Sequence, residues 1–455
     1  MKGEKMSHAV RRALLVALVF VCVLPTAATV ARSGPNSRHS AIRGGDVDRT
    51  SVHLTATYDA SLKLDWSAGT IRVRSEMRVT NTSGGPIDRV ELNTVAPALG
   101  NMKLLETTVD GRSAKVNVGE QTLTVHLGGV LPKGAKATVL IRYDARLRDG
   151  SSGRSWMFSR DNGIRSVHRW IPWVSRKRSF FDAAAGDPFF TALSPRVDVE
   201  ITADRPLIYA STGSPSGGKG NTRRFHAVNV RDFNFTAAPD YGRLTGWSRD
   251  GETKIVVFSR TFPRPVVLQA AKDAIAIFEK KLGQYPYPRL TISEASGGSG
   301  MESPGHVWIS RTYPHYLLRF LTVHEVGHQW FYGVVGSDQP RQPFADEAVT
   351  DFLTRWYLGA FRSSQCSQAR LDGSVYDYSG SCLHEVIYIQ GGNFLDKLRH
   401  DIGNTRFWNA LRDYYQNHRW QFGTTYELLE RLRKSANAAG VNVMPRYRHR
   451  FPTIY

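Results

Sequence analysis

The sequence contains few cysteines and no apolar run long enough to cross a membrane as a helix. Its three cysteines provide no second pair, so a zinc site built from cysteines is not expected. The apolar run at residues 13–24 is twelve residues long, whereas a membrane-spanning helix needs roughly twenty. The chain also lacks internal repeats, long low-complexity segments and nucleic-acid-binding motifs. These absences argue against a repeat protein and against a nucleic-acid-binding protein.

Acidic residues are outnumbered, with 40 Asp and Glu against 60 Lys and Arg, which gives a net charge of +20. Most of this excess lies after residue 31. A basic surface favours anionic partners, and anionic cell-surface polymers or lipid headgroups are the candidates. The same charge is also compatible with simple solubility. At 455 residues and 41% hydrophobic content, the chain is long enough for two or three domains with their own cores.

The first 31 residues have the organisation of a secretory signal peptide. A basic start is followed by the apolar run 13–24 and then by small residues, with cleavage expected after Ala28 or Ala31. We therefore expect a secreted protein, or one anchored on the outer face of a membrane if the segment stays uncleaved. Residues 32–46 are rich in Ser, Arg, Gly and Asn and indicate a linker.

The most informative stretch is residues 324–328, which read H-E-V-G-H. Residues four apart lie on one face of a helix, so His324 and His328 can face one metal ion. Glu325 is then close enough to reach a water on that metal. The pattern is typical of zinc proteases. A polar helix face arising by chance is the alternative, but the apolar residues around the motif predict a buried helix, in which polar groups need partners.

A second helical pattern supplies a third candidate ligand. It covers residues 346–358, with Pro343 before it and Gly359 after it as start and stop signals. Glu347 lies in the first turn, nineteen residues after His328. Two histidines and one glutamate form a known catalytic zinc set. We therefore predict one Zn²⁺ ion, held by the two histidines of the motif and Glu347.

Two further motifs flank the zinc motif. Residues 300–305 read G-M-E-S-P-G, and residues 388–392 read Y-I-Q-G-G. Eighteen residues, 329–346, separate the zinc motif from Glu347. In this order the three motifs resemble G-x-M-E-N, H-E-x-x-H-(18 residues)-E and Y-x-K-G of the M1 (gluzincin) aminopeptidases. The resemblance extends more loosely over nearly all of the chain after the first forty residues. It implies hydrolysis of the N-terminal bond of peptides that have a free N-terminus.

The resemblance also implies a role for each motif residue. Glu325 would act as general base on the attacking water and pass the proton to the leaving amine. Tyr388 would donate a hydrogen bond to the tetrahedral intermediate. Glu302, with Gly300 and Met301 beside it, would bind the protonated N-terminal amine, so that one residue is removed at a time.

Several assignments stay open at this point. Tyr378 is the alternative to Tyr388, and Asp351 could either orient a zinc-bound histidine or be an exposed helix carboxylate. Ser303 and Gln390 depart from the family pattern, which has Asn and Lys there. The alternative functions are a zinc endopeptidase with the same chemistry and an inactive zinc-containing module that binds anionic polymers.

The expected fold class is multidomain α+β. Residues 47–248 contain short alternating segments separated by turn residues, which is typical of an all-β sandwich or saddle-like domain. Residues 249–455 contain strands followed by helices and resemble a thermolysin-like zinc peptidase domain. The cluster at residues 168–173 (H-R-W-I-P-W) is either core or a binding surface. The expected strands are 51–58, 61–66, 70–81, 90–93, 122–127, 138–143, 196–202, 225–235, 254–259 and 290–293, and the later helices are 265–282, 386–401, 406–418 and 425–436.

Two cysteines remain beyond the apolar N-terminal run, Cys366 and Cys382. In an exported chain such a pair predicts a disulfide, which would hold the approach to the site and contribute about 3 kcal/mol. Two free buried thiols are the alternative. The basic tail, residues 446–450, is expected to be exposed.

Overall fold

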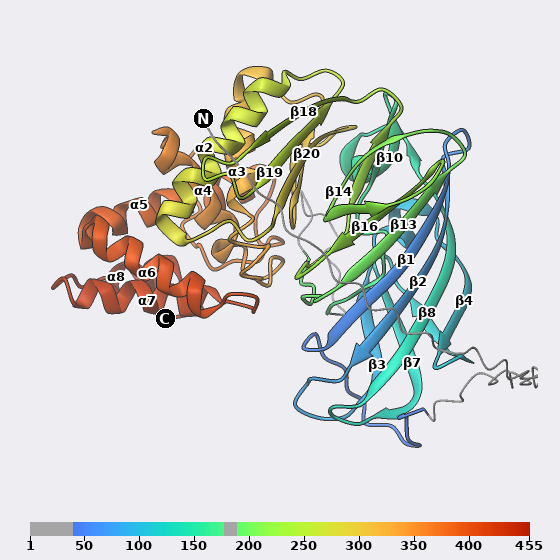
Figure 1. Cartoon of the computed structure of the whole chain (residues 1–455). Coiled ribbons are helices and arrows are strands. Elements are labelled where there is room, and N and C mark those ends of the chain that lie inside the picture. The colour runs from blue at the N-terminus through green and yellow to red at the C-terminus, as the bar shows by residue number, and fades with distance from the viewer. Residues whose placement is uncertain (1–39, 177–188) are drawn as a thin grey trace, which may run out of the picture. The chain divides into compact units, whose positions relative to one another are not determined.

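The computed structural model describes residues 40–176 and 189–455 (Figure 1). The predicted signal peptide, residues 1–31, and the first part of the predicted linker lie outside the described residues. Among the helices that are described, none combines the length and the apolar character needed to cross a bilayer.

The N-terminal part is built on one large sheet with a buried and an exposed face. β1 (Thr55–Asp65) pairs along its length with β2 (Thr70–Thr80), and β8 (Lys136–Arg146) continues the sheet. Burial alternates from residue to residue along these strands, as expected when one face lies on a core. The other strands of this eight-stranded sheet are β4 (Lys103–Val109), β5 (Arg112–Ser113), β13 (Val197–Ala203), β15 (Ser214–Gly217) and β16 (Thr222–Ala227).

A second sheet shares the core of the first. Tyr58 on β1 stacks on Trp173 of β12 (Trp173–Val174) with ring centroids 4.2 Å apart, and its hydroxyl accepts a hydrogen bond from Val174 N at 3.0 Å. Residues 168–173 are all buried, so this cluster belongs to the core. This confirms the predicted β-rich N-terminal fold. The second sheet also contains β3 (Ile87–Asn93), β6 (Val116–Val118) and β7 (Thr122–Leu131), and a third sheet contains β9 (Arg148–Asp149), β10 (Phe158–Asp161), β11 (Ile164–Val167), β14 (Ile208–Ser211) and β17 (Phe235–Ala238).

Three strand predictions were wrong in extent. The predicted strands 51–58 and 61–66 are one strand, β1, because Asp59 sits on the solvent face and pairs with Arg196 at 2.9 Å instead of breaking the strand. The predicted strand 225–235 is divided between β16 and β17, which belong to different sheets.

The C-terminal half contains a five-stranded mixed sheet. β19 (Lys254–Ser259), β20 (Arg289–Ala295) and β22 (His306–Ser310) are parallel, and the edge strands β18 (Gly242–Trp247) and β21 (Gly300–Ser303) are antiparallel to them. β18 precedes the division predicted at residue 248, yet its partner in the sheet is β19. Because it belongs to this sheet, β18 is part of the C-terminal half.

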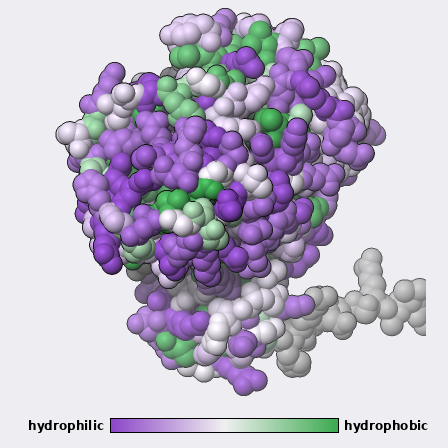
Figure 2. Space-filling model, turned by 90° about the vertical axis from the view of Figure 1, so that its left-hand side faces the viewer, coloured by the Kyte–Doolittle hydropathy of each residue, from purple (hydrophilic) through white to green (hydrophobic). Residues whose placement is uncertain are grey.

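Helices follow the sheet, as the sequence pattern predicts. Figure 1 shows the C-terminal helices grouped together, away from β1, β2 and β8. The face that they present is mostly hydrophilic with small separate hydrophobic patches (Figure 2), because their apolar residues are turned into the core. The helices of this half are α2 (Arg264–Leu282), α3 (Leu318–Gly327), α4 (Glu347–Leu358), the π-helical turn η4 (His384–Gln390), α5 (Gly391–Ile402), α6 (Asn404–Asn417), α7 (Thr425–Asn437) and α8 (Met444–Arg450).

The prediction of an exposed basic tail holds only in part. Residues 446–450 lie in α8, where Arg448 and His449 are exposed and Tyr447 is fully buried. Arg450 is partly buried and donates through Nη2 to Gln390 Oε1 at 2.6 Å. The aromatic residue in the middle of the basic run is buried, so one side of the run lies against the protein and the other faces solvent.

Cys366 and Cys382 form a disulfide, as the sequence predicts. The bridge closes a loop between α4 and η4 with a sequence separation of 16. We expect the Cys366→Ala/Cys382→Ala double variant to lose about 3 kcal/mol of unfolding free energy, because its unfolded chain regains the freedom that the loop removes. Denaturant unfolding measures this loss, and the reduced wild type is the control that should match the variant. Equal stability of the oxidised wild type and the variant would contradict the expectation.

Candidate functional site

α3 carries the two motif histidines at its C-terminal end. His328 follows the last helical residue, and its Nε2 lies 3.1 Å from the Nε2 of His324. Both imidazoles are buried. Gly327 lies between them, and a Cβ there would meet Thr350 Cγ2 at 2.9 Å. The glycine therefore allows α3 to approach α4 closely.

This approach brings Glu347, the first residue of α4, to the histidine pair. Its Oε2 lies 3.4 Å from His324 Nε2 and 3.3 Å from His328 Nε2. The three atoms lie within 4.8 Å of one another. Glu347 Oε2 is buried and makes no hydrogen bond. Two imidazole nitrogens and a carboxylate oxygen, converging with a free lone pair, fit the donor set of a catalytic zinc ion.

The carboxyl groups at the site have shifted pKa values. Burial raises the pKa of Glu325 to about 7, which suits a group that takes and returns a proton near neutral pH. Burial acts in the same direction on Glu347, but the charge of His328 outweighs it and holds the pKa of Glu347 below its usual range. The pKa values of Glu325 and Glu347 are thus shifted in opposite directions.

Asp346 holds the second histidine, which the sequence analysis did not foresee. His328 Nδ1 donates to Asp346 Oδ1 at 2.7 Å, so Nε2 keeps its lone pair for a metal. The sequence left Asp351 open as either a histidine-orienting group or an exposed helix carboxylate. It is neither, because it is buried and Arg355 binds its carboxylate one turn along α4. Asp346 immediately precedes the helix, where aspartate normally caps, but its side chain makes no cap.

We expect Asp346→Ala to lower zinc affinity or activity about 10–100-fold, because the histidine loses the group that fixes its tautomer. Competition with a chelator measures the affinity. Asp351→Asn is the control, since it should affect stability through Arg355 and leave zinc affinity near that of the wild type. The assignment would be reversed if Asp351→Asn weakened zinc binding more than Asp346→Ala.

The 300–302 segment forms the edge strand β21 beside α3. A Cβ on Gly300 would lie 2.0 Å from Glu325 Oε1, so the glycine leaves room for that carboxylate. Met301 is buried, and Glu302 accepts a hydrogen bond at Oε1 from Gln339 Nε2 at 2.9 Å. All three residues line a cavity of about 450 Å³ together with the three candidate zinc ligands.

Tyr388 lies in η4, a π-helical turn of the kind often found at functional sites. Its ring stacks against His324 with centroids 5.8 Å apart, and it lines the cavity. Burial raises the pKa of Tyr388 well above its usual value, so its hydroxyl stays a donor. Tyr378, the alternative, is not among the cavity-lining residues, and its hydroxyl donates to Arg370 O at 3.0 Å.

The disulfide loop reaches the same cavity. Gly380, Ser381 and Leu383 line it, and Cys382 lies among them. The bridge therefore holds one wall of the cavity, as the sequence predicts.

Comparison with known proteins identifies solved structures that have the same fold. No protein-family model matches the chain, and no curated protein matches its sequence. Among solved structures, a mutant of a two-domain M1 zinc metallopeptidase bound to L-arginine is 16% identical, with a TM-score of 0.65 over 85% of this chain and 92% of that chain. A mutant M1 zinc metallopeptidase from Deinococcus radiodurans is 14% identical, with a TM-score of 0.65 over 88% of this chain and 95% of that one.

A third match is a mutant of the Deinococcus radiodurans M1 zinc metallopeptidase bound to a Tyr-Ser-Ala substrate, at 15% identity and a TM-score of 0.64, over 85% of this chain and 93% of that one. At such identities the likeness concerns the fold. The predicted multidomain α+β class is confirmed, and the chain has the fold of the two-domain M1 zinc metallopeptidases.

Proposed function

We propose that the protein is a zinc aminopeptidase that removes single residues from peptides with a free N-terminus. The observation that carries the proposal is that Glu302 lines the same cavity as His324, His328 and Glu347. The structural likeness to M1 zinc metallopeptidases bound to amino acids and to a peptide supports it.

The residues divide the reaction between them. Bound zinc would supply an acidified water and polarise the scissile carbonyl. Glu325 takes the proton of the attacking water and delivers it to the leaving amine. The hydroxyl of Tyr388 donates a hydrogen bond to the oxygen on which negative charge develops.

Glu302 determines which bond is cut. A carboxylate beside the metal binds an ammonium group well, because the two carry opposite charges and Glu302 is partly shielded from solvent. A peptide anchored by its terminal ammonium presents its first peptide bond to the metal. An acetylated N-terminus carries no charge, so Oε2 of Glu302 loses the ammonium partner that a free N-terminus provides.

We expect Glu302→Ala to lower kcat/KM for free aminoacyl substrates roughly 10–100-fold, since a hydrogen bond to a charged group contributes about 1.5–3 kcal/mol. The preference of the wild type for free over N-acetylated substrates should disappear in the variant. Zinc content, measured in parallel, should be unchanged. Equal cleavage of free and N-acetylated peptides by the wild type would select the zinc endopeptidase. Bound zinc without hydrolysis would select the inactive binding module.

We also propose export of the protein, on the basis of its first 31 residues and of a disulfide that suits an oxidising compartment. N-terminal sequencing of the mature protein tests it. The anionic partners expected from the net charge gain no further support. Arginines on the exposed face of the large sheet are paired, for example Arg72 with Asp144 at 2.8 Å, so we do not propose such partners.

A further inference from the structure

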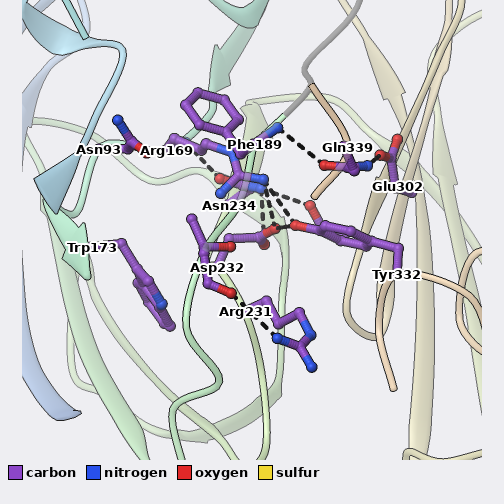
Figure 3. A network of polar contacts seen from close by, with 12 residues as sticks. Asn93, Arg169, Trp173, Phe189, Arg231, Asp232, Asn234, Glu302, Tyr332 and Gln339 are labelled. Atoms are coloured by element: carbon purple, nitrogen blue, oxygen red, sulfur yellow. Dashed lines mark hydrogen bonds and ion pairs between the residues drawn. The ribbon is translucent and has the colours of Figure 1, made fainter. Parts of the chain in front are cut away.

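Gln339 lies in the connection between α3 and α4, between the partly buried carboxylate of Glu302 and the buried carboxylate of Asp346. Its Nε2 donates to Glu302 Oε1 at 2.9 Å and to Asp346 Oδ2 at 2.8 Å. Both hydrogens of the amide are therefore used, one on each acid. Figure 3 shows the link to Glu302.

A third contact fixes the orientation of this amide. Gln339 Oε1 accepts a hydrogen bond from Phe189 N at 3.0 Å (Figure 3). The side chain is 4% exposed, so water contributes little. In the reversed orientation, the amide oxygen would face the carboxylates of Glu302 and Asp346, and the amide NH₂ would face the N–H of Phe189. None of these contacts could be a hydrogen bond. Only the observed orientation satisfies all of these groups.

Gln339 thereby joins the substrate side of the cavity to the metal side. Asp346 accepts from Gln339 at Oδ2 and from His328 at Oδ1. The path Glu302–Gln339–Asp346–His328 is unbroken. Among the described residues, Oε2 of Glu302 makes no hydrogen bond, which leaves it for a ligand. We propose that Gln339 is a positioning residue that aims Glu302 at the substrate amine and Asp346 at the zinc-binding histidine. The substrate half of this inference rests on the proposed function.

A second metal ion is the competing explanation for this cluster. Glu302, His328 and Asp346 each offer an atom within 4.8 Å of the others. However, the Gln339 amide donates to both carboxylates, and Nδ1 of His328 donates to Asp346. His328 has no lone pair left for a second ion, because its Nδ1 carries the hydrogen donated to Asp346 and its Nε2 faces Glu347 at the proposed zinc site. The geometry therefore favours a hydrogen-bonded network and one metal ion per chain.

The test compares Gln339→Met, which keeps the length and loses every hydrogen bond, with Gln342→Met. Gln342 is a matched control, because it lies in the same connection and also accepts from a backbone N–H, that of Thr425 at 3.1 Å, but it does not line the cavity. Both are made in a Glu325→Gln background, so that binding is measured without hydrolysis. Calorimetry gives the affinity of the zinc-loaded protein for a tripeptide and for its N-acetylated form. Competition with a chelator gives zinc retention.

We expect Gln339→Met to weaken binding of the free tripeptide about tenfold, to leave the N-acetylated form unchanged, and to weaken zinc retention about tenfold. Gln342→Met should leave both the preference for the free over the N-acetylated tripeptide and the zinc retention unchanged. In a Glu302→Ala background, Gln339→Met should cause no further loss of discrimination, because it acts through Glu302. In enzyme that retains Glu325, Gln339→Met should raise KM for free substrates by a larger factor than it lowers kcat. If Gln339→Met does not fold, Gln339→Glu, which cannot donate to either acid when ionised, should lose discrimination in the same way.

The two proposals fail separately. A wild type that does not distinguish free from acetylated peptides overturns the proposed function, while zinc retention still tests the link from Gln339 to Asp346. A wild type that discriminates, with unchanged discrimination and zinc retention in Gln339→Met, overturns the role of Gln339. Two zinc ions per wild-type chain overturn it as well.

Discussion

Replacement of Glu325 by glutamine will lower kcat by about 10²–10⁴-fold, the range by which general acid–base catalysis contributes. Glutamine has nearly the same shape and still fits beside Gly300, but it cannot take a proton from water. Zinc content should stay at one ion per chain, because the three ligands are untouched. Steady-state kinetics with parallel elemental analysis measures both quantities.

Glu279→Gln is the matched control for that experiment. Glu279 is a partly buried glutamate on α2 whose Oε1 accepts from Tyr285 N at 2.9 Å, and it does not line the cavity. Its replacement should leave kcat near the wild-type value. Wild-type activity in Glu325→Gln would remove the assigned base and with it the proposed mechanism.

Removal of zinc by a chelator will bring peptide hydrolysis to background, and stoichiometric zinc will restore it. Stability should fall as well, because an ion that binds only the folded chain stabilises it by about 4 kcal/mol at a thousand times its dissociation constant. Without the ion, the carboxyl groups of Glu302, Glu325 and Glu347 line one cavity with no metal charge to offset theirs. Thermal unfolding with and without zinc measures the difference.

Glu347→Ala separates loss of the metal from other effects of the chelator. The variant should resemble the stripped wild type, and stoichiometric zinc should not restore its activity. A chelated wild type that keeps its kcat would contradict both the metal assignment and the function built on it.

The sequence could predict the candidate metal ligands because their spacing is local. His324 and His328 are one helical turn apart, and Glu347 begins the next helix. Asp346 could not be assigned in this way. Helical spacing does not predict the direction of a residue that precedes a helix. The same spacing placed Asp351 on the face of Glu347, but Arg355 binds the carboxylate of Asp351 instead.

Contacts between distant segments were beyond the sequence. Gln339 owes its orientation to Phe189, 150 residues earlier. Ser303, where the family pattern has asparagine, has its hydroxyl bound by Asn234 Nδ2 at 2.6 Å. At the position where the family pattern has an asparagine, the amide group is therefore supplied by Asn234, from another part of the chain. No periodicity or spacing signals such a pairing.

Helix extent was predictable where apolar residues recur regularly, as in α2, α6 and α7. It failed at η4, where the widened turn that holds Tyr388 comes before α5. A pattern of apolar residues does not distinguish such a turn from a regular one. The catalytic tyrosine candidate was therefore found through its motif and not through its helix.

The hydrogen bonds from Phe189 N and Asn234 Nδ2 have a practical consequence for dissecting this chain. A recombinant fragment starting at Gly242 would retain every candidate zinc ligand and yet lack both donors. Gln339 and Ser303 would then face solvent or rearrange. Loop residues of the N-terminal half thus help to form the wall of the cavity, and truncation at Gly242 would remove their contribution.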